Sequence, residues 1–391
     1  MSGRSRHVDV AVIGGGIVGT ATATFLAEAG LAVRLHEQTA IAAGASGRNS
    51  GIVQHPFDPV LADLYRRSIR EYRELADSDV GFRLPDEPTG LLYVGRDERL
   101  ARAEASSWAA TWPDARAEVL AGAELVVREP CLAPDLVACR LEVGYPVEPA
   151  AATQAFARRA RAAGVEIEIG GTAAVAMTGG RAIGVELDGE PRPSGAVVIA
   201  AGPWTPQLVD PAGAWRPIRP VWGVVAAVTL DRPPRHGLES IDIDIEPGGA
   251  AESGPDRPAD TAGVDFSLQS AIGSCALGST FLADEPIPAE WVDRLRLVGS
   301  RYVPEVAAAP VLGLRHCARP VSLDGRPLVG EAPWCDGLWI AAGNGPWGIS
   351  TGPGTARVLV DRLLGVEREP IPTALAVDRF GAPSGADMLG A

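Results

Sequence analysis

Residues 8–37 read V-D-V-A-V-I-G-G-G-I-V-G-T-A-T-A-T-F-L-A-E-A-G-L-A-V-R-L-H-E. The short apolar, β-branched run Val10–Ile13 predicts a buried strand. Thr20–Ala29 has the composition of a helix, and Ala32–Leu35 predicts a second buried strand that leads to Glu37. The order of strand, glycine turn, helix, strand and acid predicts one βαβ unit.

Three glycines of this unit, Gly14, Gly16 and Gly19, have G-x-G-x-x-G spacing. In such a motif the first glycine permits a tight turn, the second lets the backbone approach a pyrophosphate, and the third lets the helix pack closely on the strand. The free N–H groups at the start of the helix favour negative charge. Glu37 is placed to accept hydrogen bonds from ribose hydroxyls, and its charge would repel a 2′-phosphate, which disfavours NADP.

A glycine-rich turn in an ordinary α/β domain is the alternative interpretation, because the glycine spacing alone is a weak signal. In this chain the strand, the helix and the terminal acid also stand at their expected positions. The sequence therefore predicts an α/β fold with a dinucleotide-binding domain.

The bulk composition limits the class of protein. The chain has 391 residues, 46% of them hydrophobic and 21% charged, which is typical of a folded protein long enough for two domains. A net charge of -14 argues against nucleic acid as a partner. No apolar run reaches the roughly 18 residues of a membrane span. The polar residues 1–8 precede the glycine motif directly, so we expect no secretory signal.

Three residue types restrict the chemistry further. The five cysteines lack C-x-x-C spacing, so we expect reduced thiols in a cytoplasmic protein. Lysine is absent from the sequence, which excludes a Schiff base on this chain. The five histidines show neither metal-ligand nor catalytic-triad spacing, so we expect no metal site and find no support for a hydrolase.

The rest of the chain alternates between helical and strand patterns. Apolar periodicity predicts helices at Pro59–Ser78, Asp97–Ala109, Ala150–Ala163 and Gly354–Leu364. Apolar runs predict strands at Gly90–Gly95, Val165–Ile169, Ala173–Thr178, Arg181–Leu187, Ala196–Ala201, Val221–Leu230 and Phe266–Phe281. We expect 165–187 to form a meander, and the Pro- and Gly-rich stretch Arg232–Asp265 to be a surface excursion, of which 244–260 could cover a substrate.

Four sequence blocks carry a family resemblance. They are the glycine motif, G-Y-P-V-E-P at 144–149, A-A-G-P-W at 200–204, and R-P-V-S-L-D-G-R-P-L-V-G at 319–330 followed by A-A-G-N-G-P-W-G-I-S at 341–350. With these blocks the chain resembles the D-amino-acid oxidase, glycine oxidase and sarcosine oxidase family of flavoproteins. The first block is common to many flavin and nicotinamide enzymes, whereas the last pair is much more specific.

The resemblance implies FAD as cofactor and two interleaved domains. A Rossmann-like FAD-binding domain would comprise 1–81, 145–219 and 311–391. A substrate-binding domain, built on a mixed and largely antiparallel sheet, would comprise 82–144 and 220–310. The cofactor-binding residues that carry over are Gly14, Gly16, Ile17, Val18, Gly19, Glu37, Gln38, Ala45, Ser46, Arg48, Asn49, Ser50, Val175, Ala201, Gly202, Trp204, Cys317, Arg319, Gly345, Gly348, Ile349 and Ser350.

Some of these residues have more than one interpretation. Arg319 matches the family arginine that clamps a substrate carboxylate, a task suited to a guanidinium fork, and a structural ion pair is the alternative; Arg315 is a weaker candidate for the clamp. Arg48 is placed to meet phosphate charge or to lie on a solvated loop. Cys317 stands seven residues before Asp324, an offset like that of the relatives' flavin-linked cysteine, which predicts either a thioether to FAD or an inert buried thiol.

Two departures from the family pattern affect the predicted catalytic residues Arg319, Asn344 and Trp347. The Gly-His pair of many relatives is Gly343-Asn344 here, and a neutral amide does not titrate. The lysine that some relatives use to promote oxygen reduction is missing, so either another cation serves or oxygen is not the electron acceptor. We expect Trp222 and Tyr145 to form part of the pocket wall.

The resemblance implies oxidation of a carbon–nitrogen bond in an amino acid or another amine, by hydride transfer to flavin N5 and hydrolysis of the resulting imine. Orientation of the substrate supplies most of the catalysis, and no residue stands out as a dedicated base. Flavin oxidation of a 2-hydroxy acid, or a biosynthetic flavin step on a larger substrate, is the first alternative. A non-catalytic flavoprotein is the second.

Overall fold

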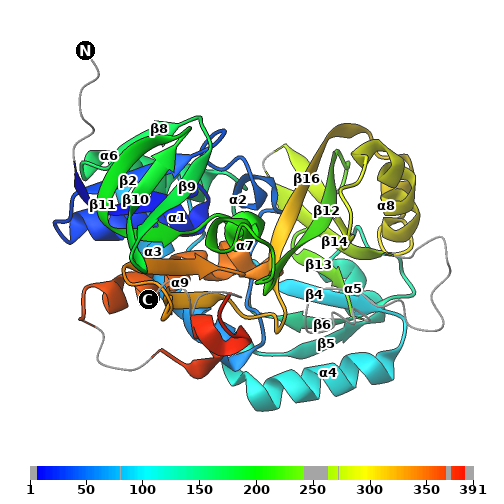
Figure 1. Cartoon of the computed structure of the whole chain (residues 1–391). Helices are drawn as coiled ribbons and strands as arrows, with labels where there is room; N and C mark the ends of the chain where they lie inside the picture. Colours follow the sequence, from blue (N-terminus) through cyan, green and yellow to red (C-terminus); the bar gives the residue numbers. More distant parts are fainter. Residues whose placement is uncertain (1–6, 80, 242–262, 272, 367–370, 384–391) are drawn as a thin grey trace.

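The computed structural model describes residues 7–79, 81–241, 263–271, 273–366 and 371–383. The segment 244–260, for which the sequence predicted a substrate cover, lies outside these residues. The described residues form two large sheets that lie side by side, with α2 (Ala45–Arg48) and α7 (Thr205–Val209) between them (Figure 1).

The first sheet has a parallel centre in the strand order β18-β11-β1-β2-β8. β17 pairs antiparallel with β18, and β9 and β10 extend antiparallel from β11. Its strands are β1 (Val8–Ile13), β2 (Val33–Glu37), β8 (Glu166–Ile169), β9 (Ala173–Thr178), β10 (Arg181–Leu187), β11 (Glu190–Ile199), β17 (Leu328–Glu331) and β18 (Leu338–Ala342). The predicted βαβ unit is confirmed, but the predicted meander is wrong at β8, which pairs in parallel with β2 because its apolar Ile167 packs with the core of that sheet.

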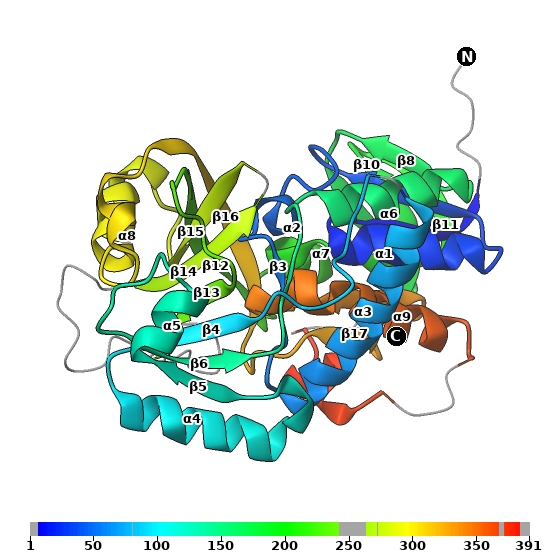
Figure 2. The same ribbon diagram turned by 180° about the vertical axis from the view of Figure 1, so that it is seen from behind.

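Four helices cover the parallel strands. They are α1 (Ile17–Glu28), α3 (Pro59–Ser78), α6 (Ala151–Ala162) and α9 (Gly348–Leu363), and Figure 2 shows them together on one side of the molecule. α1 packs on α6 and α9, and α9 packs on α3. The helices predicted at 59–78 and 150–163 are confirmed, but α9 begins at Gly348, six residues before the predicted start at Gly354.

The second sheet has the order β16-β12-β15-β14-β13-β4-β6-β5 and is antiparallel except where β13 meets β4. Helices α4 (Glu98–Thr111), α5 (Gly122–Arg128) and α8 (Val292–Gly299) lie beside it. Its strands are β4 (Leu91–Gly95), β5 (Glu118–Ala121), β6 (Val137–Leu141), β12 (Ile218–Val228), β13 (Gly237–Ser240), β14 (Val264–Ala271), β15 (Ser274–Thr280) and β16 (Val311–Ser322). The short pair β3 (Ile52–Val53) and β7 (Tyr145–Pro146) joins two distant parts of the chain.

Two features of this sheet differ from the sequence-based prediction. β13 lies within the stretch predicted to be a surface excursion, and it pairs with both β4 and β14. β16 pairs with β12 along its whole length, although the predicted boundary at residue 311 assigns it to the FAD-binding domain. The other domain boundaries stay a prediction. Among the described residues no helix has the length and apolar character needed to cross a bilayer.

Candidate active site

A cavity of about 920 Å³ connects the glycine turn after β1 with the inner face of the second sheet. Its walls include the ends of strands β1, β2 and β11, the short helix α2 and the start of α9. On the other side it reaches strands β12 to β16. The cavity therefore brings together parts of the chain that are more than 300 residues apart in sequence.

The glycine turn has the geometry that its spacing predicted. Gly14 has a φ of +116°, and a Cβ there would lie 2.4 Å from the carbonyl oxygen of Ala200. A Cβ at Gly19 would lie 1.9 Å from the carbonyl oxygen of Gly14, so α1 packs on the turn only with glycine at this position. Gly14, Gly16, Ile17 and Val18 line the cavity, whereas Gly19 acts behind it as a packing residue.

Side chains already hold two N–H groups of this turn. Glu37 Oε2 accepts from the Gly15 N–H at 2.7 Å, and its Oε1 accepts from the Thr39 N–H at 2.9 Å. Ser46 Oγ accepts from the Ile17 N–H, at the start of α1, at 2.9 Å. Glu37, Ser46 and the turn are therefore fixed to one another in the cavity wall.

The segment after β2 wraps against the second sheet through α2. Arg48 is exposed, lines the cavity and donates from Nη1 to the carbonyl oxygen of His316 at 3.2 Å. The Asn49 side chain donates to the Ser46 carbonyl at 2.9 Å and accepts from the Gly51 N–H at 2.8 Å, so it fixes the local loop. Gln38, Ala45 and Ser50 also line the cavity.

Of the site residues predicted at β9 and after β11, some line the cavity and one does not. Ala201, Gly202 and Trp204, after β11, line the cavity. Val175 does not: it lies mid-strand in β9, partly buried against a core cluster of the first sheet. The residues of this hairpin that reach the cavity are Gly171, Thr172, Ala173 and Leu187.

The start of α9 forms the opposite part of the wall. Gly345, Trp347, Gly348, Ile349 and Ser350, all predicted site residues, line the cavity. Because α9 begins at Gly348, the N–H groups of its first turn lack partners within the helix and favour negative charge. Ser350 Oγ accepts from the Gln54 N–H at 2.8 Å, which ties β3 and its extension to this helix start.

Arg319 lies on β16 with its guanidinium held against β15. Nη1 donates to the Thr280 carbonyl at 2.8 Å, and Nη2 donates to Ser279 Oγ. Both hydrogen-bond partners are neutral, and they fix the orientation of the guanidinium. Burial lowers the pKa of Arg319, while Cys317 and Asp265 act in the opposite direction. Of the other predicted pocket residues, Trp222 lines the cavity, whereas Arg315 and Tyr145 do not.

Asn344 lines the cavity but uses its amide elsewhere. Its Nδ2 donates to Thr351 Oγ1 at 2.9 Å and to Thr355 Oγ1 at 2.8 Å, both in α9. These bonds favour a role in holding α9 rather than the predicted catalytic role. The sequence already indicated a different role, because an asparagine that does not titrate stands here in place of the histidine of many relatives.

Cys317 is 7% exposed and lines the cavity two residues before Arg319. Burial raises the pKa of its thiol, and the positive charges of Arg319, Arg48 and Arg315 lower it. All five cysteines of the chain are free. The position permits either of the two predicted fates, a bond to a cofactor or an unreactive thiol.

Sequence reasoning identified Glu37 but missed three other acidic residues that line the cavity, Glu239, Asp265 and Glu285. Glu239 lies on β13, where Gln54 Nε2 donates to its Oε2 at 3.1 Å. Burial raises the pKa of Glu239 to about 7, and the nearby Asp265 adds to this shift. The only local signal for a strand here was the alternation of the apolar Leu238 with polar neighbours, and this alternating segment is too short to predict a strand.

A parallel sheet with a glycine turn, a terminal acid on β2 and a long cavity shared with a second sheet is typical of a dinucleotide-binding protein. The family described as FAD dependent oxidoreductase, abbreviated DAO, matches residues 9–362. The chain belongs to this family, and it is therefore an FAD-dependent oxidoreductase. The recognised resemblance and the predicted fold class are confirmed.

Named relatives lie within the same family. The chain is 28% identical to a glycine oxidase of Pseudomonas aeruginosa, over 93% of this chain and 96% of the relative. It is 29% identical to a D-amino acid dehydrogenase of Cereibacter sphaeroides, over 59% of this chain. The match spans only 50% of that dehydrogenase, about half its length.

Solved structures share the fold across nearly the whole chain. A glycine oxidase from Geobacillus kaustophilus superimposes with a TM-score of 0.78 and 23% identity, covering 96% of this chain and 99% of that one. An iminodiacetate oxidase from a Chelativorans species gives a TM-score of 0.77 and 22% identity, covering 96% and 98%. At these identities the likeness establishes the fold.

The residues of the cavity fit FAD. The tight approach at Gly14 and Gly16 leaves backbone rather than side chains along the wall, which suits a pyrophosphate. A carboxylate ends β2, and two helix starts, those of α1 and α9, face the same cavity. In the described part of the chain no group of three or more metal-ligating side chains is found.

Proposed function

We propose that this protein oxidises a carbon–nitrogen bond of an amino acid or of another amine. The observation that carries the proposal is the single cavity that joins the glycine turn of the first sheet to Arg319 in the second. A carboxylate-binding cation thus shares one space with the residues that fit FAD. The names of the relatives, which include glycine oxidase and iminodiacetate oxidase, support the same class of substrate.

In this proposal the glycine turn and the start of α1 bind the pyrophosphate, and Glu37 accepts from the ribose. The N–H groups at the start of α9 stabilise negative charge on the pyrimidine end of the flavin. When bound, FAD would supply the acceptor for the hydride, which carries both electrons away from the substrate. The protein residues supply position and electrostatics.

Arg319 holds the substrate carboxylate in this proposal, while Trp222 and Trp347 restrict the remaining space. Binding orients the α-carbon, and orientation contributes much of the rate. The nitrogen must be neutral when the hydride leaves, because its lone pair forms the imine bond. Water then hydrolyses the imine to a carbonyl compound and ammonia or an amine.

The direct test is a panel of amino acids and amines added to the purified holoprotein without oxygen. We expect at least one amine to bleach the visible flavin absorbance within seconds. A panel that leaves the colour unchanged would exclude amine oxidation. Bleaching by 2-hydroxy acids alone would favour the first alternative, and no bleaching by any small substrate would favour a non-catalytic flavoprotein.

We further propose how the flavin is attached, which molecule reoxidises it and where in the cell the protein works. Cys317 lies in the cavity wall and is a candidate for a thioether to the flavin; acid precipitation decides this, because a covalent flavin stays in the pellet. Oxygen or another acceptor takes the electrons from the flavin, and the rate of reoxidation in air distinguishes them. A cytoplasmic location is supported by five free thiols.

A further inference from the structure

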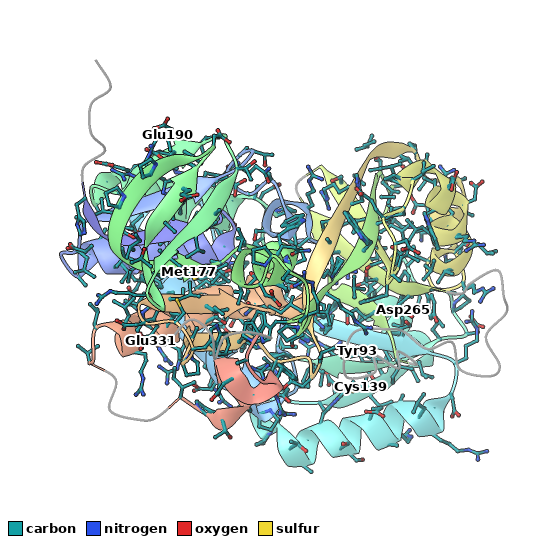
Figure 3. The ribbon with its side chains drawn as sticks, viewed as in Figure 1. Tyr93, Cys139, Met177, Glu190, Asp265 and Glu331 are labelled. Carbon is teal, nitrogen blue, oxygen red and sulfur yellow. The ribbon has the colours of Figure 1, made fainter. Side chains whose placement is uncertain are left out.

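The second sheet presents a polar face to the cavity. On β14, Asp265 and Ser267 line the cavity, whereas Leu268 lies in the core on the opposite face; Phe266 belongs to the same core and also reaches the cavity lining. On β13, Glu239 stands directly beside Ser267 and lines the cavity, while Leu238 lies in the core. Figure 3 labels Asp265 and Tyr93; Tyr93 is on β4 and pairs with Glu239 of β13. The alternation aims two carboxylates of this sheet into the cavity.

Hydrogen bonds fix Glu239 relative to the start of α9. Gln54 Nε2 donates to Glu239 Oε2 at 3.1 Å and lies equally far from the Tyr93 hydroxyl oxygen. The backbone N–H of the same Gln54 donates to Ser350 Oγ in the first turn of α9. One residue therefore bridges the carboxylate and the helix start that we assign to the flavin.

Arg319 lies on β16 of the same sheet, and its guanidinium reaches across to β15. Ser267 pairs with Glu239 on one side and with Gly278 of β15 on the other. Arg319 donates to Ser279, the next residue of β15. Two strand spacings, about 10 Å, separate the backbones of β13 and β15, and the side chains reach into the cavity between them. One wall thus carries the Arg319 cation and, two strand spacings from its guanidinium, the Glu239 carboxylate, with Asp265 on the strand between them.

We propose that Glu239 binds the ammonium group of an amino-acid substrate, whose carboxylate Arg319 holds, and that Glu239 accepts the ammonium proton before the carbon–hydrogen bond breaks. The inference rests on the proposed function. In this step an N–H bond breaks, its electron pair stays on nitrogen, and an O–H bond forms on the carboxylate. Glu239 later releases the proton to solvent through the open cavity.

The electrostatic surroundings of Glu239 agree with this role. The charged and titratable groups that act on it are Tyr93 on β4 and Asp265 on β14. Asp265 also acts on Arg319 of β16. Burial raises the pKa of Tyr93 well above its usual range, so it stays a neutral hydrogen-bond partner. Burial raises the pKa of Glu239 to about 7, which is where a general base works best near neutral pH.

The arrangement selects the chemical class of substrate. A zwitterionic amino acid places its ammonium group beside Glu239 and its carboxylate beside Arg319, whereas a 2-hydroxy acid pairs only with Arg319 and leaves Glu239 facing an uncharged hydroxyl. A polar site rejects a partner that leaves its charged groups unpaired. The inference therefore favours amino acids over 2-hydroxy acids of the same size.

The experiment measures flavin bleaching by the reactive amino acid without oxygen, from pH 5.5 to pH 10, in the wild type and in Glu239→Gln. We expect the wild-type rate to rise with a midpoint near 7. In Glu239→Gln that limb is lost, the rate at pH 7 falls at least 100-fold, and it rises only as the substrate ammonium itself ionises at about 10. Glu290→Gln, at an exposed carboxylate that does not line the cavity, keeps the wild-type midpoint.

A second variant and a binding measurement complete the test. Asp265→Asn should lower the midpoint of the rising limb, because it removes a negative charge near Glu239. Calorimetric titration with the 2-hydroxy analogue of the substrate should show a lower Kd for Glu239→Gln than for the wild type. A Glu239→Gln variant with the wild-type midpoint and a rate within threefold would overturn the inference but not the proposed function. A wild type that no amine bleaches would overturn both.

Discussion

The guanidinium carbon of Arg319 lies 4.4 Å from the ring centroid of Phe281, and both side chains line the cavity. On the strand beside it, Gly223 leaves the room that the guanidinium needs, since a Cβ there would lie 2.4 Å from Nη2. The guanidinium of Arg319 is thus fixed in one orientation by stacking on Phe281, by two hydrogen bonds to neutral groups and by the space left at Gly223. A carboxylate approaching from the cavity meets a preorganised cation.

This geometry predicts a large effect of Arg319→Lys. Lysine keeps the charge but loses the planar fork and its stacking, so we expect kcat/KM for an amino acid to fall about 10- to 100-fold, as for a lost bond to a charged group. The rate with an amine that lacks a carboxylate should change much less. Steady-state kinetics with both substrates measures the difference.

Arg294→Lys is the matched control, because Arg294 also stacks on an aromatic ring, that of Trp291, but does not line the cavity. It should leave both kinetic values unchanged. If Arg319→Lys reduced both substrates equally, the arginine would be a structural residue and not a carboxylate clamp.

The βαβ unit could be predicted because its signals are local, and most residues that the family resemblance assigned to the cofactor line the cavity. The end of the chain shows where local signals fail. Gly352, Pro353 and Gly354 disfavour a helix by propensity, so the predicted helix began at Gly354. The real α9 contains all three. A Cβ at Gly352 would lie 2.7 Å from Ile17 of α1, and one at Gly354 would lie 2.0 Å from the Leu64 carbonyl oxygen of α3.

Glu239 was missed for a related reason. Its strand is only four residues long and stands between prolines, glycines and a charged stretch. β13 is stabilised by its neighbours β4 and β14, which are far away in sequence. Propensity carries no information about such partners. The same limit applies to β16, which was quoted as a motif but not predicted as a strand.

Close helix packing gives the second prediction. Gly354→Ala should destabilise the protein although alanine favours helices, because the added methyl group meets backbone and not a movable side chain. We expect a loss of about 1–3 kcal/mol, as for other overpacked sites, and a fall in Tm of several degrees. Gly348→Ala, in the first turn of the same helix, has its nearest atom at 4.0 Å and should leave the Tm almost unchanged. Equal Tm values for the two variants would contradict the packing argument.

Asn344 gives the third prediction. The side-chain amide of Asn344 donates hydrogen bonds to Thr351 and Thr355 of α9. Asn344→Ala should therefore lower the free energy of unfolding by about 1–2 kcal/mol. The pH dependence of flavin bleaching should keep its midpoint, because an amide does not titrate. Thermal unfolding and the pH profile measure the two effects separately. A changed midpoint with unchanged stability would restore the catalytic role predicted from the sequence.

Glu239 gives the last prediction, which concerns stability and not rate. Burial raises the pKa of this carboxyl to about 7 in the folded protein, against about 4.3 for an unfolded glutamate. The folded state therefore binds this proton more tightly than the unfolded state. The resulting contribution to folding is present in full below pH 4, is lost as the pH rises to about 7, and is absent above it.

Glutamine keeps the shape of the side chain and has no proton to lose, so Glu239→Gln should be more stable than the wild type at pH 8 and equally stable near pH 4.5. We expect a difference of a few degrees in Tm at pH 8. Calorimetric scans of the flavin-free proteins at both pH values measure it without any contribution from cofactor binding. The exposed Glu285→Gln should show no difference at either pH. A Glu239→Gln difference that is the same at pH 4.5 and pH 8 would show that the carboxyl titrates normally in the folded protein.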